Sequence, residues 1–243
     1  MELNGKISVV TGASTGIGRA IAKALSAEGA TVALVGRNRD GLEISRQQIE
    51  KVGGKSKIFY ADLTQVDAIT RLATDIINTY KSVDIVANIA GSWHDNHIAY
   101  VDQYLENIST EQILEVINVN LLAPIFLAQQ FVPAMKKQSC GKILNISGTF
   151  SDGGAKWLHY FTAKQAVEIF TVGLADELRD FNIQVNCISP SDVATEASKK
   201  FFPDLVGPVL DPDEVAKLAV WLVSSKTANN ITGQTIVVKG SNT

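Results

Sequence analysis

The chain has 243 residues, of which 46% are apolar and 19% are charged, and its formal net charge is −3. This composition is typical of a soluble globular protein with a sizeable core, and the small negative charge argues against bulk attraction to nucleic acid or to anionic membranes. No basic signal-peptide region and no apolar run of about 20 residues is evident, so we expect a cytoplasmic protein without a membrane partner. Cys140 and Cys187 lie far apart, and the three histidines have no ligand spacing, so we predict free thiols and no metal site.

Short apolar runs alternate with longer amphipathic runs along the whole chain. We predict strands at 7–10, 31–35, 57–61, 83–87, 142–146, 183–188 and 235–238, and helices over about 17–29, 38–52, 65–80, 109–137, 158–180 and 212–224. This alternation predicts parallel strands joined by right-handed crossovers, and strands without polar alternation predict a sheet that is covered on both faces. The sequence therefore predicts a single doubly wound α/β domain over residues 1–243, with about seven parallel strands and helices on both faces.

Gly12, Gly16 and Gly18 follow the first predicted strand and lead into the first predicted helix. Glycines at this junction allow a tight turn and let backbone N–H groups approach a pyrophosphate at the helix N-terminus. An ordinary glycine-rich turn is the alternative. The position at the first strand–helix junction of a doubly wound sheet is the context that a dinucleotide motif requires, so we predict a dinucleotide site.

The residues after the second predicted strand favour one type of dinucleotide. They read Gly36-Arg37-Asn38-Arg39, where an NAD site would place an acidic residue that binds both ribose hydroxyls. A guanidinium fits a 2′-phosphate, so Arg37 predicts NADP(H) in preference to NAD(H). Solvated loop arginines are the alternative. Asp62, after the third predicted strand, either accepts a hydrogen bond from the adenine amino group or caps the next helix.

Tyr160 and Lys164 lie four residues apart in a helical pattern, so they stand on the same face of that helix. An ammonium close to a phenol favours the phenolate, and we expect the pKa of Tyr160 to fall from about 10 toward neutral pH. A tyrosine of this kind can move a proton on or off a carbonyl oxygen. A tyrosine that merely packs on a lysine stem is the alternative.

The pattern Thr11-Gly12-x-x-x-Gly16-x-Gly18 with Tyr160-x-x-x-Lys164 resembles the short-chain dehydrogenase/reductase family, and most of all its 3-oxoacyl-carrier-protein reductases. Matching segments follow in the family's order at Asp62-Leu63, Asn88-Ile89-Ala90-Gly91, Asn118-Val119-Asn120, Pro190-Ser191-x-Val193-x-Thr195 and Ile231-Thr232-Gly233-Gln234. The resemblance implies a Rossmann-type, NADP(H)-dependent oxidoreductase that transfers a hydride between nicotinamide and a ketone or secondary alcohol. Its candidate substrates are small molecules and 3-oxoacyl thioesters.

The resemblance also implies roles for individual residues. Tyr160 would protonate the carbonyl oxygen, and Lys164 would lower the pKa of Tyr160 and hold the nicotinamide ribose. Asn120 would hold a water that links Lys164 to solvent, although alone it would be interpreted as a helix-bending or capping residue. The implied cofactor-binding set is Gly12, Ser14, Thr15, Gly16, Ile17, Gly18, Arg37, Asp62, Leu63, Asn88, Ala90, Gly91, Tyr160, Lys164, Pro190, Val193 and Thr195.

The family's serine, which holds the substrate oxygen at the end of the fifth strand, is ambiguous in this chain. Counting forward from Gly141 places it at Gly148, whereas counting back from Tyr160 places it at Ser147. Because side chains alternate along a strand, a shift of one residue decides whether a hydroxyl faces the site. We predict Ser147 as the catalytic serine, with Thr149 or Ser151 as substitutes.

Two segments at the carboxyl ends of strands depart in length from the family pattern. The loop 92–106 is long, aromatic and histidine-containing, whereas the lid segment 195–212 is short. We hypothesise that Trp93 and its loop take over part of the lid's role and line the substrate mouth. A surface loop or a subunit contact is the alternative.

The remaining expectations concern partners and competing functions. Lys136-Lys137 and Lys199-Lys200 are either docking sites for an acyl carrier or solvated helix ends. The resemblance implies a homotetramer or homodimer formed through the helices at 109–137 and 158–180, with Ile169, Phe170 and Leu174 in the interface or simply in the core. A non-catalytic NADP-binding or regulatory protein is the main alternative function, and isomerase or dehydratase chemistry is another.

Overall fold

The computed structural model of the chain describes residues 1–149, 154–204 and 207–240. Seven parallel strands form one sheet in the order β3-β2-β1-β4-β5-β6-β7. The strands are β1 (Ile7–Thr11), β2 (Thr31–Gly36), β3 (Lys55–Tyr60), β4 (Ile85–Asn88), β5 (Gly141–Ile146), β6 (Ile183–Pro190) and β7 (Thr235–Val238). The predicted doubly wound α/β fold is confirmed.

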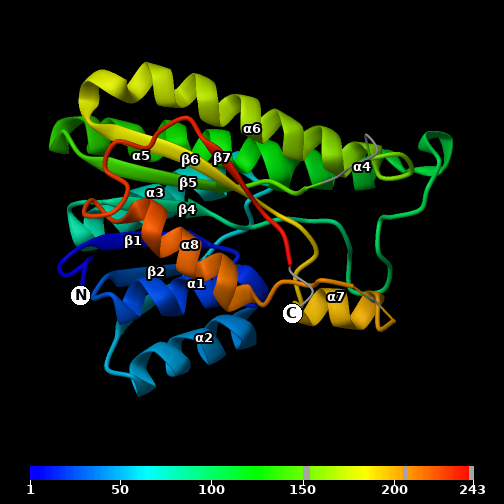
Figure 1. The fold of residues 1–243 in the computed structure, drawn as a ribbon, viewed down its shortest axis with the longest axis horizontal. Helices are drawn as coiled ribbons and strands as arrows, with labels where there is room; N and C mark the ends of the chain where they lie inside the picture. The colour runs from blue at the N-terminus through cyan, green and yellow to red at the C-terminus, as the bar shows by residue number, and fades with distance from the viewer. Residues whose placement is uncertain (150–153, 205–206, 241–243) are drawn as a thin grey trace.

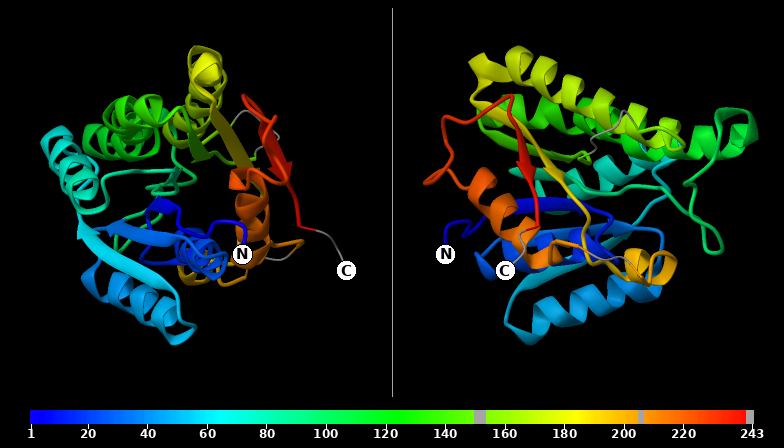
Figure 2. Two further views of the ribbon diagram at one scale, coloured as in Figure 1. Left: turned by 90° about the vertical axis from the view of Figure 1, so that its left-hand side faces the viewer. Right: turned by 45° about the vertical axis from the view of Figure 1, so that its right-hand side comes forward.

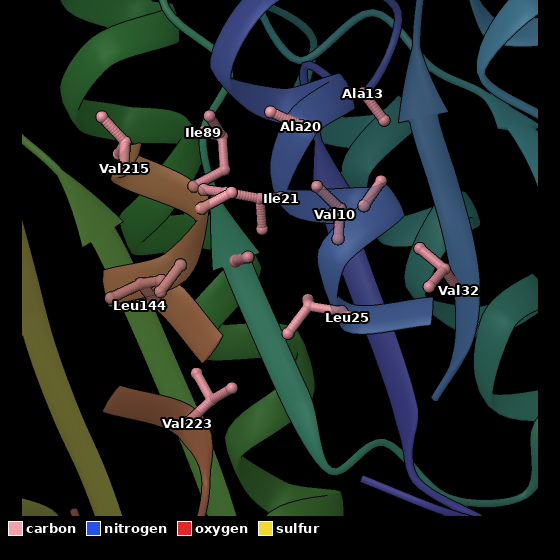
Figure 3. Close-up of a cluster of buried hydrophobic side chains, with 14 of the residues drawn as sticks. Val10, Ala13, Ala20, Ile21, Leu25, Val32, Ile89, Leu144, Val215 and Val223 are labelled. Carbon is pink, nitrogen blue, oxygen red and sulfur yellow. The ribbon is translucent and has the colours of Figure 1, made fainter. Parts of the chain in front are cut away.

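Helices cover both faces of the sheet, as Figure 1 shows. They are α1 (Gly16–Ala27), α2 (Arg39–Lys51), α3 (Val66–Tyr80), α4 (Thr110–Ile117), α5 (Ala123–Gln138), α6 (Leu158–Leu178), α7 (Glu196–Phe201) and α8 (Pro212–Val223). One core lies between the sheet and the layer of α1, α2 and α8, and Figure 3 shows part of it, including Ile21 and Leu25 of α1 and Val215 and Val223 of α8. A second core lies under α3, α5 and α6.

The order of the strands reverses between β1 and β4, which are neighbours in the sheet although two strands separate them in the sequence. The crossovers from these two strands leave in opposite directions, and this opens a crevice at their carboxyl ends. Figure 2 shows α7 and the green segment that holds loop 92–106 at this same end of the molecule. The fold therefore brings the glycine-rich turn, the long loop and the short lid together.

The helix predicted over 109–137 is interrupted. A π-helical segment, Asn118–Leu122, separates α4 from α5, and it contains Asn120. A π-bulge is rare and is found mostly at functional sites, because it turns a side chain out of the regular helical register. Sequence periodicity did not reveal it.

One expectation about apolar runs is corrected. The helical run Thr110–Gln138 is long and apolar enough to cross a membrane by length and composition alone, with a mean hydropathy of 1.4. In the fold, α5 packs against α3 and β5, and 44% of the most apolar window is buried. The core helix of a soluble protein passes the same test, so length and composition alone are weak evidence for a membrane span.

Helix α7 was not predicted. It has six residues, which is too short for an apolar period to be visible in the sequence. Its N-terminus is capped by Thr195, whose hydroxyl accepts a hydrogen bond from the Ser198 N–H at 3.1 Å. The segment predicted as a short lid therefore starts with one ordered turn of helix at the mouth of the crevice.

Candidate active site

A cavity of about 450 Å³ occupies the crevice at the carboxyl ends of the strands. Its walls include most of the residues predicted from the sequence, namely Gly12, Ser14, Thr15, Gly16, Ile17, Gly18, Arg37, Asp62, Leu63, Ala90, Gly91, Trp93, Ser147, Tyr160, Lys164, Pro190, Val193 and Thr195. Asn88, Asn120 and Thr149 were also predicted but are not part of the lining. The glycine turn, the Tyr160–Lys164 pair and the long loop thus share one cavity.

The turn after β1 is tight and packs closely against the backbone at the end of β4. Gly12 has a φ of +65°, and a Cβ placed on it would lie 2.9 Å from the backbone of Ala90. The Thr11 hydroxyl accepts hydrogen bonds from the N–H groups of Ile89 and Ala90, at 2.9 and 3.1 Å, and so joins the ends of β1 and β4. A side chain at position 12 would collide with the end of β4, so this tight turn requires glycine; the turn lines the cavity and leads into the N-terminus of α1, where backbone N–H groups can receive a pyrophosphate.

A carboxylate of the protein already contacts this anion-binding helix start. Glu196, the first residue of α7, accepts a hydrogen bond from the Gly16 N–H at 3.0 Å and one from the Arg19 guanidinium at 2.7 Å. Burial raises the pKa of Glu196, but hydrogen bonds from Thr15 and Gly16 outweigh burial and hold the pKa below its ordinary value. The N-terminus of α1 therefore stabilises negative charge, as a phosphate site requires.

The far end of the cavity carries Arg37, with 60% of its side chain exposed. Its guanidinium forms loose ion pairs with Asp62 and Glu115, at 3.9 and 3.8 Å. Asp62 accepts hydrogen bonds from the backbone and hydroxyl of Thr64, at 3.0 and 2.8 Å, so it caps the turn before α3. Arg39 is not simply a solvated charge, because its guanidinium lies 4.0 Å from the centre of the Tyr60 ring.

The Tyr160–Lys164 pair lies on α6, where both side chains line the cavity. Lys164 is buried, its ammonium donates to the Ile146 carbonyl at 3.0 Å, and burial lowers its pKa to about 8. The expected fall in the pKa of Tyr160 is wrong for the free protein. Burial raises this pKa, and the carboxylate of Asp192 raises it further. The physical reason is that desolvation of a phenolate here outweighs the lysine, whose Nζ lies 5.5 Å from the centre of the Tyr160 ring.

Asn120 lies directly behind the cavity wall. Its amide donates to the carbonyls of Ser92 and Val116, at 2.7 and 2.9 Å, and its buried Oδ1 has no hydrogen-bond partner among the described residues. A Cβ placed on Gly91 would lie 3.0 Å from this Oδ1 and 3.7 Å from the Lys164 ammonium. An unpaired buried acceptor beside a lysine is a suitable site for an ordered water.

The end of β5 resolves the register that the sequence left ambiguous. The Ser147 hydroxyl donates to Glu168 at 2.6 Å, whereas a Cβ placed on Gly148 would lie 3.6 Å from the Tyr160 hydroxyl. The Thr149 hydroxyl donates to the Ser189 carbonyl at 2.8 Å. Ser151 lies outside the described residues. The geometry thus places position 148, which the forward count selects, beside the Tyr160 hydroxyl, whereas the hydroxyl of the predicted Ser147 is directed to Glu168.

Asn88 does not reach the cavity. Its amide donates to Asn145 at 2.8 Å, and the Asn145 amide donates to the Thr171 hydroxyl at 2.9 Å. Asn88 and Asn145 lie opposite each other in the pairing of β4 with β5, so their side chains point to the same face of the sheet. Here that face is covered by α6. The side chain of Asn88 is therefore part of a buried polar chain between β4 and α6.

Some lining residues were missed by the sequence analysis as candidates. They include Asn38, Val119, Trp157, Asp192, Ser198 and Phe202. Most of these residues lie within a few positions of a predicted site residue, so closeness in the sequence could have identified them as candidates. Trp157 starts α6 three residues before Tyr160, at the same end of the helix as the predicted acid.

Comparisons with known proteins agree with this geometry. A family model described as short chain dehydrogenase matches residues 6–205. The chain is 32% identical over 251 residues to 3-oxoacyl-[acyl-carrier-protein] reductase FabG of Aquifex aeolicus, which covers 99% of this chain and 98% of that protein. It is 31% identical over 253 residues to the NAD-dependent glycerol dehydrogenase of Listeria innocua, covering 100% and 95%. The crystal structure of a metagenomic short-chain oxidoreductase in complex with NADP superposes with a TM-score of 0.86 at 27% identity, over all of both chains.

The match thus extends over the glycine turn, the Tyr160–Lys164 pair and the sheet that positions them. The protein belongs to the short-chain dehydrogenase/reductase family and is an oxidoreductase that transfers a hydride between a nicotinamide cofactor and a carbonyl or alcohol carbon.

Proposed function

We propose that this enzyme is an NADPH-dependent ketone reductase. The observation that carries the proposal is the combination of a buried Lys164 beside Tyr160 with an exposed Arg37 at the far end of the same cavity. The bound nicotinamide would supply or accept the hydride. The residues of the protein would bind the cofactor, hold the carbonyl and deliver the proton.

Arg37 supports the preference for NADP(H) over NAD(H). A guanidinium that is 60% exposed, with only two loose ion pairs, has donors left for a 2′-phosphate. Asp62 is engaged by Thr64, so it is a poor substitute for the acidic residue that would bind a ribose diol. The relatives include an NAD-dependent enzyme, so this preference must rest on the chain's own residues.

A protonated Tyr160 fits the reductive direction. A tyrosine that stays protonated at neutral pH can donate its proton to the oxygen of a ketone as the hydride arrives. The Lys164 ammonium would then stabilise the phenolate that remains, and a water held by Asn120 would return the proton to Tyr160 by way of Lys164. The family's serine hydroxyl is expected beside Tyr160, but the residue at that position is Gly148, and the neighbouring Ser147 hydroxyl donates to Glu168.

The test is NADPH oxidation with a panel of ketones and 3-oxoacyl thioesters. Removal of the phenolic proton in Tyr160→Phe should lower kcat/KM by about 10²-fold or more, which is the usual contribution of a general acid. NADPH binding, followed by cofactor fluorescence, should persist. Tight NADPH binding without turnover of any compound would instead favour the alternative, a binding or regulatory protein on the same fold.

Arg37→Glu is the matched test of cofactor choice. A carboxylate would repel the 2′-phosphate and could bind the ribose hydroxyls, so the ratio of kcat/KM for NADPH to that for NADH should fall by at least about tenfold. An unchanged ratio would contradict the assignment of Arg37 to the 2′-phosphate.

We also propose, from the resemblance, a cytoplasmic homotetramer or homodimer.

A further inference from the structure

The mouth of the cavity carries aromatic side chains that the proposed proton transfer does not use. Trp93 and His94 of loop 92–106, Trp157 at the start of α6 and Phe202 after α7 line the cavity, and Phe201 of α7 packs against Trp93 and His94. We refer to these five residues as the aromatic wall. They come from three segments that are far apart in the sequence.

Trp93 is the centre of the aromatic wall. Its ring stacks on Phe202 with centroids 5.8 Å apart and meets Phe201 edge-on at 5.8 Å and Trp157 edge-on at 6.2 Å. Trp157 in turn stacks on Tyr160, at 5.1 Å and an interplanar angle of 23°. The wall therefore continues without a break from the lid to the phenol that donates the proton.

The loop that carries Trp93 is held in place by its own hydrogen bonds. The Tyr100 N–H donates to the Trp93 carbonyl at 2.8 Å, and the Tyr100 hydroxyl donates to Glu115 of α4 at 3.2 Å. The Lys200 ammonium of α7 donates to the Asn96 carbonyl at 2.7 Å and so joins the lid to the loop. The wall is therefore preorganised, and a ligand that packs on it does not have to order it first.

The charges around the aromatic wall have both signs and are held by contacts within the protein. Lys156 is paired with Asp102 at 2.8 Å, whereas Lys200 keeps its positive charge, donates to the neutral Asn96 carbonyl and lies 5.0 Å from the centre of the Phe201 ring. Asp192 lines the cavity close enough to Tyr160 to oppose ionisation of the phenol. A neutral apolar group can pack on these rings without the desolvation cost that a charged phosphate arm would bear.

We infer that the substrate is a neutral ketone borne on a flat ring system, which packs against the aromatic wall while its carbonyl oxygen faces Tyr160. Aromatic rings prefer stacked and edge-on ring partners, whereas a flexible chain gains no such geometry and must be ordered on binding. The inference rests on the proposed reductase function and names the substrate class of that same site.

Three probes of different shape test the inference in steady-state NADPH oxidation. They are a fused bicyclic aryl ketone, an open-chain ketone with the same number of carbon atoms, and acetoacetyl-coenzyme A. The bicyclic ketone should have the highest kcat/KM, by at least about tenfold. Trp93→Ala should remove most of this preference by raising KM, and Trp93→Phe should retain most of it.

Trp221 provides the matched control. It is a partly exposed tryptophan on α8, outside the cavity lining, and Trp221→Ala should leave all three rates unchanged. In Tyr160→Phe saturated with NADP⁺, the bicyclic ketone should quench the fluorescence of the wall tryptophans, whether or not turnover is measurable.

Two results would overturn the inference while the proposed function stands. One is an equal or higher kcat/KM for the open-chain ketone or the thioester, with no effect of Trp93→Ala. The other is the absence of quenching by the bicyclic ketone in the Tyr160→Phe complex. Failure of the wild-type enzyme to bind NADPH would reject the proposed function itself, and the substrate inference with it.

Discussion

Burial shifts the two groups of the Tyr160–Lys164 pair in opposite directions. It lowers the pKa of the lysine to about 8 and raises that of the tyrosine, because in both cases it disfavours the charged form. The free enzyme therefore holds a protonated acid beside a lysine that is only just protonated at neutral pH. This balance suits a group that gives up a proton and regains it in every cycle.

The dependence of kcat/KM on pH should follow the protonation of Lys164. Below about pH 8 Lys164 is charged and can stabilise the phenolate that forms on Tyr160, and above about pH 8 it loses its proton and this stabilisation. We expect kcat/KM for ketone reduction to be flat at lower pH and to fall as pH rises through about 8. The measurement is kcat/KM from pH 6 to 10, and Lys164→Arg should move the fall to higher pH. A profile that rises with pH would contradict this assignment.

Gly148 and Ser147 make opposite predictions under substitution. Gly148→Ser places a hydroxyl near the Tyr160 oxygen in ordinary van der Waals space, so it should fold and raise kcat for ketone reduction by about tenfold or more. Ser147→Ala removes the hydrogen bond to Glu168 and should lower the free energy of unfolding by about 1 kcal/mol.

Kinetics and urea unfolding of the two variants distinguish the positions. The kcat of Ser147→Ala should stay close to that of wild type. A large loss of kcat in Ser147→Ala, with unchanged stability, would restore Ser147 as the group that holds the substrate oxygen.

At the scale of elements, α7 is attached to α1 through the Glu196 carboxylate, which is negatively charged like the pyrophosphate of the proposed cofactor. Glu196 occupies donors at the N-terminus of α1, and Arg19 holds the same carboxylate. An incoming pyrophosphate must share or displace these contacts. The lid and the cofactor site are thereby coupled, although the two elements are separated by most of the chain.

Glu196→Gln should therefore bind NADPH more tightly. Removal of a negative charge beside the helix N-terminus is worth about 1 kcal/mol, which corresponds to a roughly fivefold lower Kd. Fluorescence titration of NADPH measures it, and the difference from wild type should shrink at high salt because the effect is electrostatic. Glu177→Gln, at an exposed position on α6, is the control. A weaker Kd for Glu196→Gln would show that the carboxylate supports the site and does not compete for it.

At the scale of the whole molecule, the outer side of α6 carries exposed aliphatic side chains near its middle. Ile169 is 74% exposed and Val172 46% exposed, whereas Phe170 and Leu174 pack against the core below. Exposed aliphatic side chains on one helix are typical of a surface that another subunit covers. Of the three residues predicted from the sequence to lie in the interface or the core, Ile169 therefore lies on the surface, and Phe170 and Leu174 belong to the core.

We predict that Ile169→Arg shifts the native mass toward the 26.1 kDa of a single chain. A buried arginine without a partner is strongly disfavoured at a subunit interface. Light scattering after size-exclusion chromatography gives the mass. Val52→Arg, at a site that is 72% exposed after α2, should leave the mass unchanged. A wild-type mass of one chain would exclude the proposed oligomer.

Much of the fold could be predicted from the sequence because its signals are local. The apolar strands and the amphipathic helices show their periods within windows of about ten residues, and their alternation restricts the topology to a few choices. The glycine turn and the Tyr160–Lys164 pair are also local spacings. The π-helical segment around Asn120 and the short α7 were missed, because the first interrupts a regular period and the second is too short to have one.

The sequence alone determined the parallel α/β sheet, the dinucleotide turn and the family to which they point, since each depends on residues that are close together in the chain. Only the tertiary structure decided that Gly148 and not Ser147 lies beside Tyr160, that Asn88 serves the core, and that the pKa of Tyr160 rises. It also placed Glu196 on Gly16 and built the wall around Trp93. These features arise from contacts between segments that are far apart in the chain. The burial of a titratable group sets its pKa, the direction of a side chain decides what it contacts, and neither can be read from residue spacing.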